Sequence, residues 1–168
     1  MRLCAFADEA SPFVEGQIKA LKRNGLDALE ERGVNEKNIS KLTLAEAKEL
    51  RSMLDAEGLS VWSIGSPIGK YKLEDDFQPH LDSLKHILEI ADILDASRIR
   101  MFSFWKPAEE PVEVTRERVF ERLYKMCEVT PSNIVLCHEN EKNIFGENIE
   151  NCLAIYKQFP TIKGVFDP

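Results

Sequence analysis

Two carboxylate side chains stand at the ends of short apolar segments in the second half of the sequence. Glu139 follows the predicted strand 133–137, and Asp167 closes the predicted strand 163–167. Neighbouring strands of a sheet lie about 4.8 Å apart, so two carboxylates at adjacent strand ends can bind one hard divalent cation. Without a cation, the two charges would repel and raise one pKa. The sequence therefore predicts that Glu139 and Asp167 bind a divalent metal ion.

The alternation of side chains along the fifth strand separates Glu139 from its neighbour. Val135, Cys137 and Glu139 share one face of an extended chain, whereas Leu136 and His138 share the other. We therefore expect Glu139 to point into the mouth of the sheet and His138 to face the helices. A single histidine there is more often structural than a ligand, and a substrate contact by His138 is the less favoured alternative.

Other polar residues also follow predicted strands and are candidate substrate contacts. Glu30 is predicted to hold a substrate hydroxyl, while Glu31, on the opposite face, is expected to be exposed at the strand end. Ser66 lies in the loop "GSPIGK", where Lys70 and backbone amides would suit a phosphate, although a plain loop is the simpler interpretation. Trp105 either packs in the core or forms a wall against a sugar.

Short apolar segments alternate with amphipathic ones along the whole chain. The predicted strands are 3–7, 26–30, 59–64, 98–104, 133–137 and 163–167, and five helical patterns lie between them. This alternation predicts βαβ units and a parallel sheet. The carboxyl ends of parallel strands meet at one edge, which is where a (β/α) barrel places its active site. The alternative is that these turns are simply polar.

Several residues mark where helices begin and end. Ser11 and Pro12 are predicted to start the first helix, as N-cap and first helical residue. Thr43 and Glu46 have the spacing of a capping box, and Gly58 is predicted to end that helix. A leucine-rich stripe over residues 81–94 predicts the third helix.

The composition favours one soluble domain over residues 1–168. The chain has 43% hydrophobic and 30% charged residues, with a net charge of −7. An acidic chain without clustered basic residues argues against nucleic-acid binding, and no apolar run is long enough to span a membrane. Four widely spaced cysteines fit free thiols in the cytoplasm. No glycine-rich dinucleotide motif follows the first strand.

Six segments together resemble a known family. "FADEAS", "LDALEERGVN", "LSVWSIGSPIGK", "IRMFSFW", "LCHENEK" with "IFGEN", and "GVFDP" are similar to the sugar phosphate isomerase/epimerase family of xylose isomerase-like TIM barrels. The resemblance implies an eight-stranded barrel with one divalent cation, Mn, Co, Mg or Zn. It also implies metal-assisted aldose–ketose isomerisation or epimerisation through an enediolate. Glu139 and Asp167 match the first two of four metal ligands in that family, and the resemblance implies that Glu139 is also the catalytic acid/base.

The sequence departs from the family pattern in its length. A barrel of this type needs about 250 residues, whereas this sequence has 168 and stops after its sixth predicted strand. We therefore expect an incomplete TIM barrel of about six strands and five helices, with the cation weakly held or absent. A shortened gene product, a truncated chain and a barrel completed by a second chain are the alternatives. Open sheet edges would favour pairing between copies of the chain.

Two other functions remain as alternatives. A truncated barrel without catalysis could persist as a binding or assembly module. Apurinic-site endonucleases share the fold, but they need several histidine ligands and a basic surface. This chain has three histidines and a net charge of −7, so that activity is disfavoured. A small sugar or sugar phosphate is the expected partner.

Overall fold

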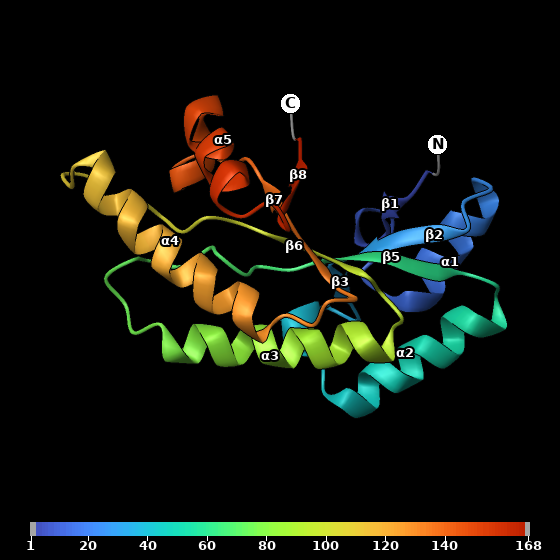
Figure 1. Ribbon diagram of the computed structural model, residues 1–168. Helices are drawn as coiled ribbons and strands as arrows, with labels where there is room; N and C mark the ends of the chain where they lie inside the picture. The colour runs from blue at the N-terminus through green and yellow to red at the C-terminus, as the bar shows by residue number, and fades with distance from the viewer. Residues whose placement is uncertain (1–2, 167–168) are drawn as a thin grey trace. The chain divides into compact units, whose positions relative to one another are not determined.

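The computed structural model describes residues 3–166, and Asp167 lies outside them. Six parallel strands of one sheet alternate with five α-helices in an α/β arrangement of the TIM-barrel type (Figure 1). By internal contacts the chain forms two compact units. The first comprises residues 1–66 with 86–99, and the second comprises residues 67–85 with 100–168. Helix α3 (Gln78–Ile93) and strand β6 (Arg98–Met101) contribute residues to both.

The first unit contains three parallel strands in the order β1-β2-β5. Its strands are β1 (Ala5–Phe6), β2 (Ala28–Glu31) and β5 (Ser60–Gly65), and its helices are α1 (Val14–Arg23) and α2 (Leu44–Ala56). The register between β2 and β5 shifts between Leu29 and Glu30, so that Glu30 lies opposite Ser63. Such an irregularity re-aims the side chains that follow it.

A small hairpin follows β2 and was not predicted from the sequence. Strand β3 (Gly33–Val34) pairs antiparallel with β4 (Lys37–Asn38). The two connecting residues, Asn35 and Glu36, have positive φ values of 53° and 62°. A two-residue turn of this kind usually carries glycine, and a glutamate gives no such sequence signal. The 3-10 turns Ala7–Glu9 and Ile39–Lys41 complete this unit.

The second unit carries the remaining strands in the order β6-β7-β8. Strand β7 (Val135–Glu139) pairs parallel with β8 (Lys163–Val165), with Glu139 opposite Val165. Helices α4 (Val112–Val129) and α5 (Ile149–Gln158) belong to this unit, with the 3-10 turn Phe145–Glu147 before α5. Phe102, Phe104 and Phe145 are among its largest fully buried side chains.

The helix signals in the sequence were mostly correct, with one exception at α1. The Thr43–Glu46 capping box is present, and Gly58 follows α2 with a φ of 70°. The predicted N-cap at Ser11 is wrong, because α1 begins at Val14 with Phe13 as its N-cap. The Ser11 hydroxyl instead accepts a hydrogen bond from the Phe13 N–H at 3.1 Å. This local turn uses the hydroxyl before the helix can do so.

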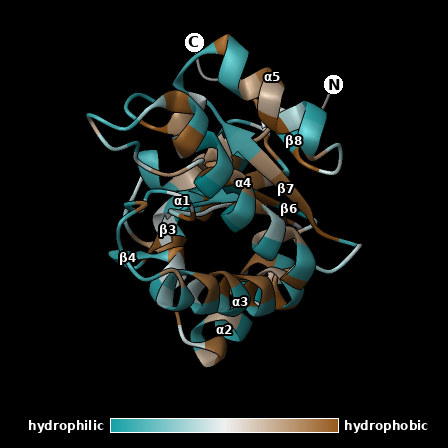
Figure 2. Ribbon diagram, turned by 60° about the vertical axis from the view of Figure 1, so that its left-hand side comes forward, coloured by the Kyte–Doolittle hydropathy of each residue, from teal (hydrophilic) through white to brown (hydrophobic). Residues whose placement is uncertain are grey.

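Hydrophobic and hydrophilic residues alternate around the helices, as expected for helices that cover a sheet (Figure 2). On α3 the predicted stripe is buried at Leu84, Leu88 and Ala91, and Leu94 just beyond the helix is buried as well. Leu81, at the start of the stripe, is half-buried. Among residues 3–166, no helix has the length and apolar character needed to cross a membrane.

Candidate active site

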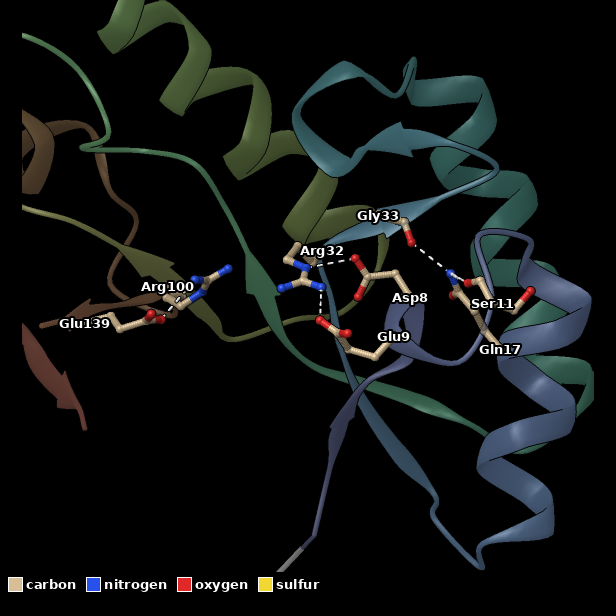
Figure 3. A network of polar contacts seen from close by, with 8 residues as sticks. All are labelled: Asp8, Glu9, Ser11, Gln17, Arg32, Gly33, Arg100 and Glu139. Carbon is tan, nitrogen blue, oxygen red and sulfur yellow. Dashed lines mark hydrogen bonds and ion pairs between the residues drawn. The ribbon is translucent and has the colours of Figure 1, made fainter. Parts of the chain in front are cut away.

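The second unit buries an ion pair at the end of strand β7. The Arg100 guanidinium on β6 donates a hydrogen bond from Nη1 to Glu139 Oε2 at 2.9 Å (Figure 3). The two side chains are only 9% and 10% exposed. Burying a carboxylate without a partner is costly, so Arg100 explains how a charged residue can end a buried strand. Glu139 thus lies at the carboxyl end of its strand, as predicted.

A second ion pair accompanies the first and shares an aromatic ring with it. The Arg100 guanidinium carbon lies 5.1 Å from the centre of the Phe102 ring, and Lys70 Nζ lies 4.3 Å from the same centre. Lys70 in turn pairs with Glu141 at 2.9 Å. The Lys70 hydrogen bond holds the pKa of Glu141 below its usual value, and Arg100 adds a smaller contribution. This cluster of Arg100, Lys70, Glu139 and Glu141 therefore balances two positive charges with two negative ones.

His138 lies on the helix-facing side of β7, as its position in the alternation predicts. It is fully buried, and its Nδ1 is 3.4 Å from the hydroxyl of Tyr156 on α5. A Cβ atom on Gly146 would lie 2.3 Å from its ring, so glycine is required there. Burial lowers the pKa of His138 to about 4, and the ring is neutral near pH 7. Its surroundings favour a packing role.

The chain after β6 is held by backbone hydrogen bonds to the loop over residues 67–71. Phe104 donates from its N–H to the Gly69 carbonyl at 2.8 Å, and Trp105 donates to the Tyr71 carbonyl at 3.0 Å. The Trp105 side chain is 41% exposed, which excludes the core alternative and leaves its face open to solvent. A role for Trp105 as a wall against a sugar stays a prediction.

The loop over residues 65–70 does not offer a free phosphate site. The Gly69 N–H donates to His80 Nε2 at 3.0 Å, and Lys70 is paired with Glu141. His80 stacks on Tyr71 with ring centres 4.7 Å apart. Burial, with a smaller effect of the charge of Arg122, lowers the pKa of His80 to about 4. The plain-loop interpretation therefore fits this segment better than a phosphate loop.

The first unit has its own polar cluster after β1 and β2. Arg32 Nε donates to Asp8 Oδ2 at 2.8 Å, and its Nη2 also contacts Glu9 (Figure 3). These carboxylates, Asp8 first, raise the pKa of Arg32, although burial opposes them. Gln17 Nε2 donates to the Gly33 carbonyl at 2.8 Å and ties α1 to the start of β3.

Glu31 is buried, which corrects the expectation that it is exposed at the strand end. Its side chain is 0% exposed, and neither carboxylate oxygen has a hydrogen-bond partner among the residues that the structure describes. Burial, followed by the negative charge of Asp8, raises its pKa to about 8. The Gly33 backbone N–H, which is near the carboxyl but outside hydrogen-bonding geometry, opposes this by a smaller amount. Glu31 is therefore protonated near neutral pH, and a neutral carboxyl is far cheaper to bury than a carboxylate.

Glu30 and Ser66, the two predicted substrate contacts of the first unit, differ in how deeply they are buried. Glu30 is half-buried and accepts a hydrogen bond from the Ser63 hydroxyl at 2.6 Å across β2 and β5. Ser66 is only 1% exposed, and its N–H donates to the Ile64 carbonyl at 3.0 Å. Glu30 is therefore less enclosed than Ser66, although its Oε1 atom is also buried.

The described residues do not complete a metal site. No group of three or more histidine, cysteine, aspartate or glutamate side chains within residues 3–166 is arranged to bind an ion. Glu139 supplies one suitable carboxylate, but Arg100 already contacts it. Its predicted partner, Asp167, lies outside the described residues. Glu139 alone would hold a hard cation weakly, because such ions require several oxygen ligands.

Arg100 was missed as a site residue, although the sequence carried a signal for it. It stands in the middle of the apolar strand segment "RIRMFSF", where a charged side chain needs a buried partner. The same side-chain alternation that was applied to Glu139 places Arg100 and Phe102 on one face. The sequence alone could not identify Glu139 as that partner, because it does not give the register between β6 and β7.

Comparisons with known proteins agree with this architecture. A family model described as a xylose isomerase-like TIM barrel matches residues 18–168. Among curated proteins, none matches the sequence.

Solved structures with the same fold include the probable 3-DHS dehydratase AsbF involved in petrobactin synthesis from Bacillus anthracis. It is 16% identical, with a TM-score of 0.79 over 99% of this chain and 63% of that one. The 3-keto-D-glucoside 4-epimerase YcjR from E. coli is 14% identical, with a TM-score of 0.76 over 99% of this chain and 68% of that one.

A xylose isomerase-like TIM barrel protein from Mycobacterium smegmatis, in complex with magnesium, is 15% identical, with a TM-score of 0.66. The match covers 99% of this chain and 63% of that one. At these identities the similarity indicates the fold alone. The chain spans less than two thirds of the length of AsbF and of the M. smegmatis protein.

Proposed function

Because the chain belongs to the xylose isomerase-like TIM-barrel family, we propose that it is an isomerase or epimerase of a sugar or sugar phosphate. The observation that carries the proposal is Glu139, a buried carboxylate at the carboxyl end of β7. Barrels of this class assemble their catalytic groups at that end of the strands. The fold shared with a sugar epimerase adds support without identifying the substrate.

Glu139 is the group that we assign to proton transfer. As a general base it would take the proton from the carbon next to the substrate carbonyl, which leaves an enediolate. Returning that proton to the neighbouring carbon interconverts an aldose and a ketose. Epimerisation instead needs a second acid on the opposite face of the enediolate. In the structure, the hydrogen bond from Arg100 to Oε2 fixes the orientation of the Glu139 carboxylate.

A divalent cation, Mn²⁺, Co²⁺, Mg²⁺ or Zn²⁺, belongs to the proposed activity. When bound, such an ion polarises the carbonyl and the adjacent hydroxyl of a sugar. Glu139 and Asp167 are the residues of this chain that we assign to it, as its first two ligands. The magnesium complex of the M. smegmatis protein supports a metal in this fold.

The proposed substrate contacts differ in how directly they could act. Trp105 is exposed enough to stack on a sugar face. We also assign Glu30 to a substrate hydroxyl, although its Oε2 atom already accepts from Ser63 and its Oε1 atom is buried. Ser66 and His138 are enclosed, so we assign them the positioning of neighbouring groups in preference to direct contact with the substrate. We expect a cytoplasmic protein whose edge strands, β1 and β8, pair between copies, since each has one neighbouring strand in the described sheet.

A product assay tests this proposal. The chain would be incubated with aldoses, ketoses and their phosphates, with and without Mn²⁺, and the sugars followed by ¹³C NMR. We expect conversion of at least one sugar, loss of that conversion in Glu139→Gln, and its retention in Glu141→Gln. Glu141 is a matched control because it is a glutamate two positions away, in an exposed pair with Lys70. Equal activity in both variants would contradict the assignment of Glu139.

A non-catalytic binding or assembly module is the second candidate. It is favoured by the pairing of Glu139 with Arg100 and by the absence of a three-ligand group among residues 3–166. Calorimetry with Mn²⁺ separates the two functions. Binding that disappears in Glu139→Gln supports the enzyme, whereas no binding in either protein supports the module.

A further inference from the structure

The Arg100–Glu139 pair occupies the position where the proposed function requires a metal ligand. Arg100 reaches Oε2 at 2.9 Å, and both side chains are about nine-tenths buried. The guanidinium is also placed over Phe102, which is itself 1% exposed. Arg100 is therefore held in a fixed place by an aromatic ring and a carboxylate, unlike a surface arginine that can swing into water.

We propose that Arg100 and a divalent cation are alternative partners of Glu139, so that the arginine limits metal binding at this carboxylate. The inference rests on the proposed role of Glu139 as a metal ligand. It adds a residue that sets the affinity of the site and keeps the carboxylate compensated when no ion is bound. Arg100 is a positioning residue in this account, since it acts through Glu139.

The charges around Glu139 support competition between Arg100 and a divalent metal ion. The positive charges of Arg100 and Lys70 already face the negative charges of Glu139 and Glu141. Both positive side chains lie over the Phe102 ring. A divalent ion at Glu139 would add two further positive charges next to the Arg100 guanidinium, in a largely buried place. Charges that share one carboxylate are too close to be screened by solvent, and their repulsion grows as the surroundings become less polar.

If Arg100 only oriented Glu139 as a metal ligand, its removal would weaken metal binding and not strengthen it. A residue that only orients a ligating carboxylate strengthens metal binding, and its loss weakens affinity about 10–100-fold. Such partners are commonly neutral or negatively charged, whereas Arg100 carries a full positive charge. The sign of the change in affinity therefore decides between the two roles.

The test measures Mn²⁺ binding by calorimetry, and the rise of the melting temperature on adding Mn²⁺, in the full chain and its variants. In Arg100→Met, which removes the charge and keeps an apolar stem against Phe102, we expect about tenfold tighter binding or more. We also expect a larger Mn²⁺-dependent rise in melting temperature, because the ion compensates the stranded carboxylate. Arg100→Lys keeps the charge and should bind Mn²⁺ no more tightly than the unaltered chain.

Lys70→Met is the matched control, since it removes one positive charge from the same cluster at an exposed pair. It should leave Mn²⁺ affinity within about threefold of the unaltered chain, because solvent screens exposed charges. The double variant Arg100→Met/Glu139→Gln should lose the tighter Mn²⁺ binding that Arg100→Met gains. Should Arg100→Met prove too unstable for calorimetry, the Mn²⁺-dependent rise in melting temperature of Arg100→Gln gives the same comparison.

Weaker or unchanged Mn²⁺ binding in the Arg100 variants would overturn the inference. If the unaltered chain then still binds Mn²⁺ through Glu139, the proposed metal role survives. An equal gain in Lys70→Met would also overturn the inference, because the effect would be general electrostatics. Absence of binding in every variant, Arg100→Met included, would contradict both the inference and the metal role.

Discussion

Arg100 and Arg32 each pair with carboxylates near strand ends, but the surroundings of the two arginines differ. Among the described residues, Arg100 pairs with Glu139, and both side chains are almost enclosed. Arg32 is 35% exposed and contacts two carboxylates, Asp8 and Glu9. A further acidic residue, Glu31, is buried near Asp8 and remains protonated. The second unit thus compensates buried charge with an opposite charge, whereas the first also removes one charge by protonation.

The largest expected effect comes from breaking the enclosed pair. Arg100→Met leaves Glu139 as an uncompensated buried charge, which should reduce the free energy of unfolding by about 3–5 kcal/mol. Urea denaturation followed by circular dichroism measures this loss. Adding Glu139→Gln to the same variant should restore most of the stability, and a double variant as unstable as the sum of the single ones would refute a direct pairing.

Glu31→Gln tests the protonation of the first unit. The folded pKa of Glu31, about 8, lies above the ordinary value of 4.5. Its contribution to stability is complete below pH 4.5 and is lost as the pH rises to about 8. The expected slope across this window is about 1.4 kcal/mol per pH unit. Glu31→Gln should flatten that decline in a series of urea titrations, and an unchanged slope would mean that Glu31 is ionised in the fold.

His80 should give the second unit the opposite pH dependence. Its folded pKa, about 4, lies below the ordinary value of 6.5, because burial disfavours the charged ring. Its contribution is complete above pH 6.5 and is lost as the pH falls to about 4, again by about 1.4 kcal/mol per pH unit. His80→Gln keeps an acceptor for the Gly69 N–H and cannot titrate. His80→Gln should remove part of the loss of stability in acid. Protonation of His138, whose pKa is also lowered to about 4, contributes to the loss that remains.

The smallest effect is expected for the exposed pair beside Arg100. Lys70 and Glu141 are 38% and 36% exposed, so solvent screens their attraction. Lys70→Met should change the free energy of unfolding by less than about 1 kcal/mol. A loss as large as that of Arg100→Met would show that the two pairs form one network and do not act separately.

Much of the fold could be predicted because its signals are local. The alternation of apolar and amphipathic segments gave all six strands and five helices, and the Thr43–Glu46 capping box marked the start of α2 correctly. The start of α1 was wrong because the Ser11 hydroxyl bonds within its own turn. The β3–β4 hairpin was missed because Glu36 occupies a positive-φ position that usually signals itself through glycine.

The candidate site was less predictable, since it depends on contacts between distant residues. Side-chain alternation placed His138 correctly toward α5, as its contact with Tyr156 confirms. The same rule could not reveal that Arg100 pairs with Glu139, which lies 39 positions away. Nor could it show that Glu31 is tolerated because it is neutral, since protonation follows from burial and from the nearby charge of Asp8.

We assign to Glu139 the transfer of a proton at the carbon beside a sugar carbonyl. The most direct measurement is deuterium incorporation at that carbon in D₂O, followed by NMR with Mn²⁺ present, because it detects proton transfer even when no product accumulates. We predict exchange with the unaltered chain and with Glu141→Gln, and a loss of at least about 100-fold in Glu139→Gln. Exchange that persists in Glu139→Gln would contradict the claim.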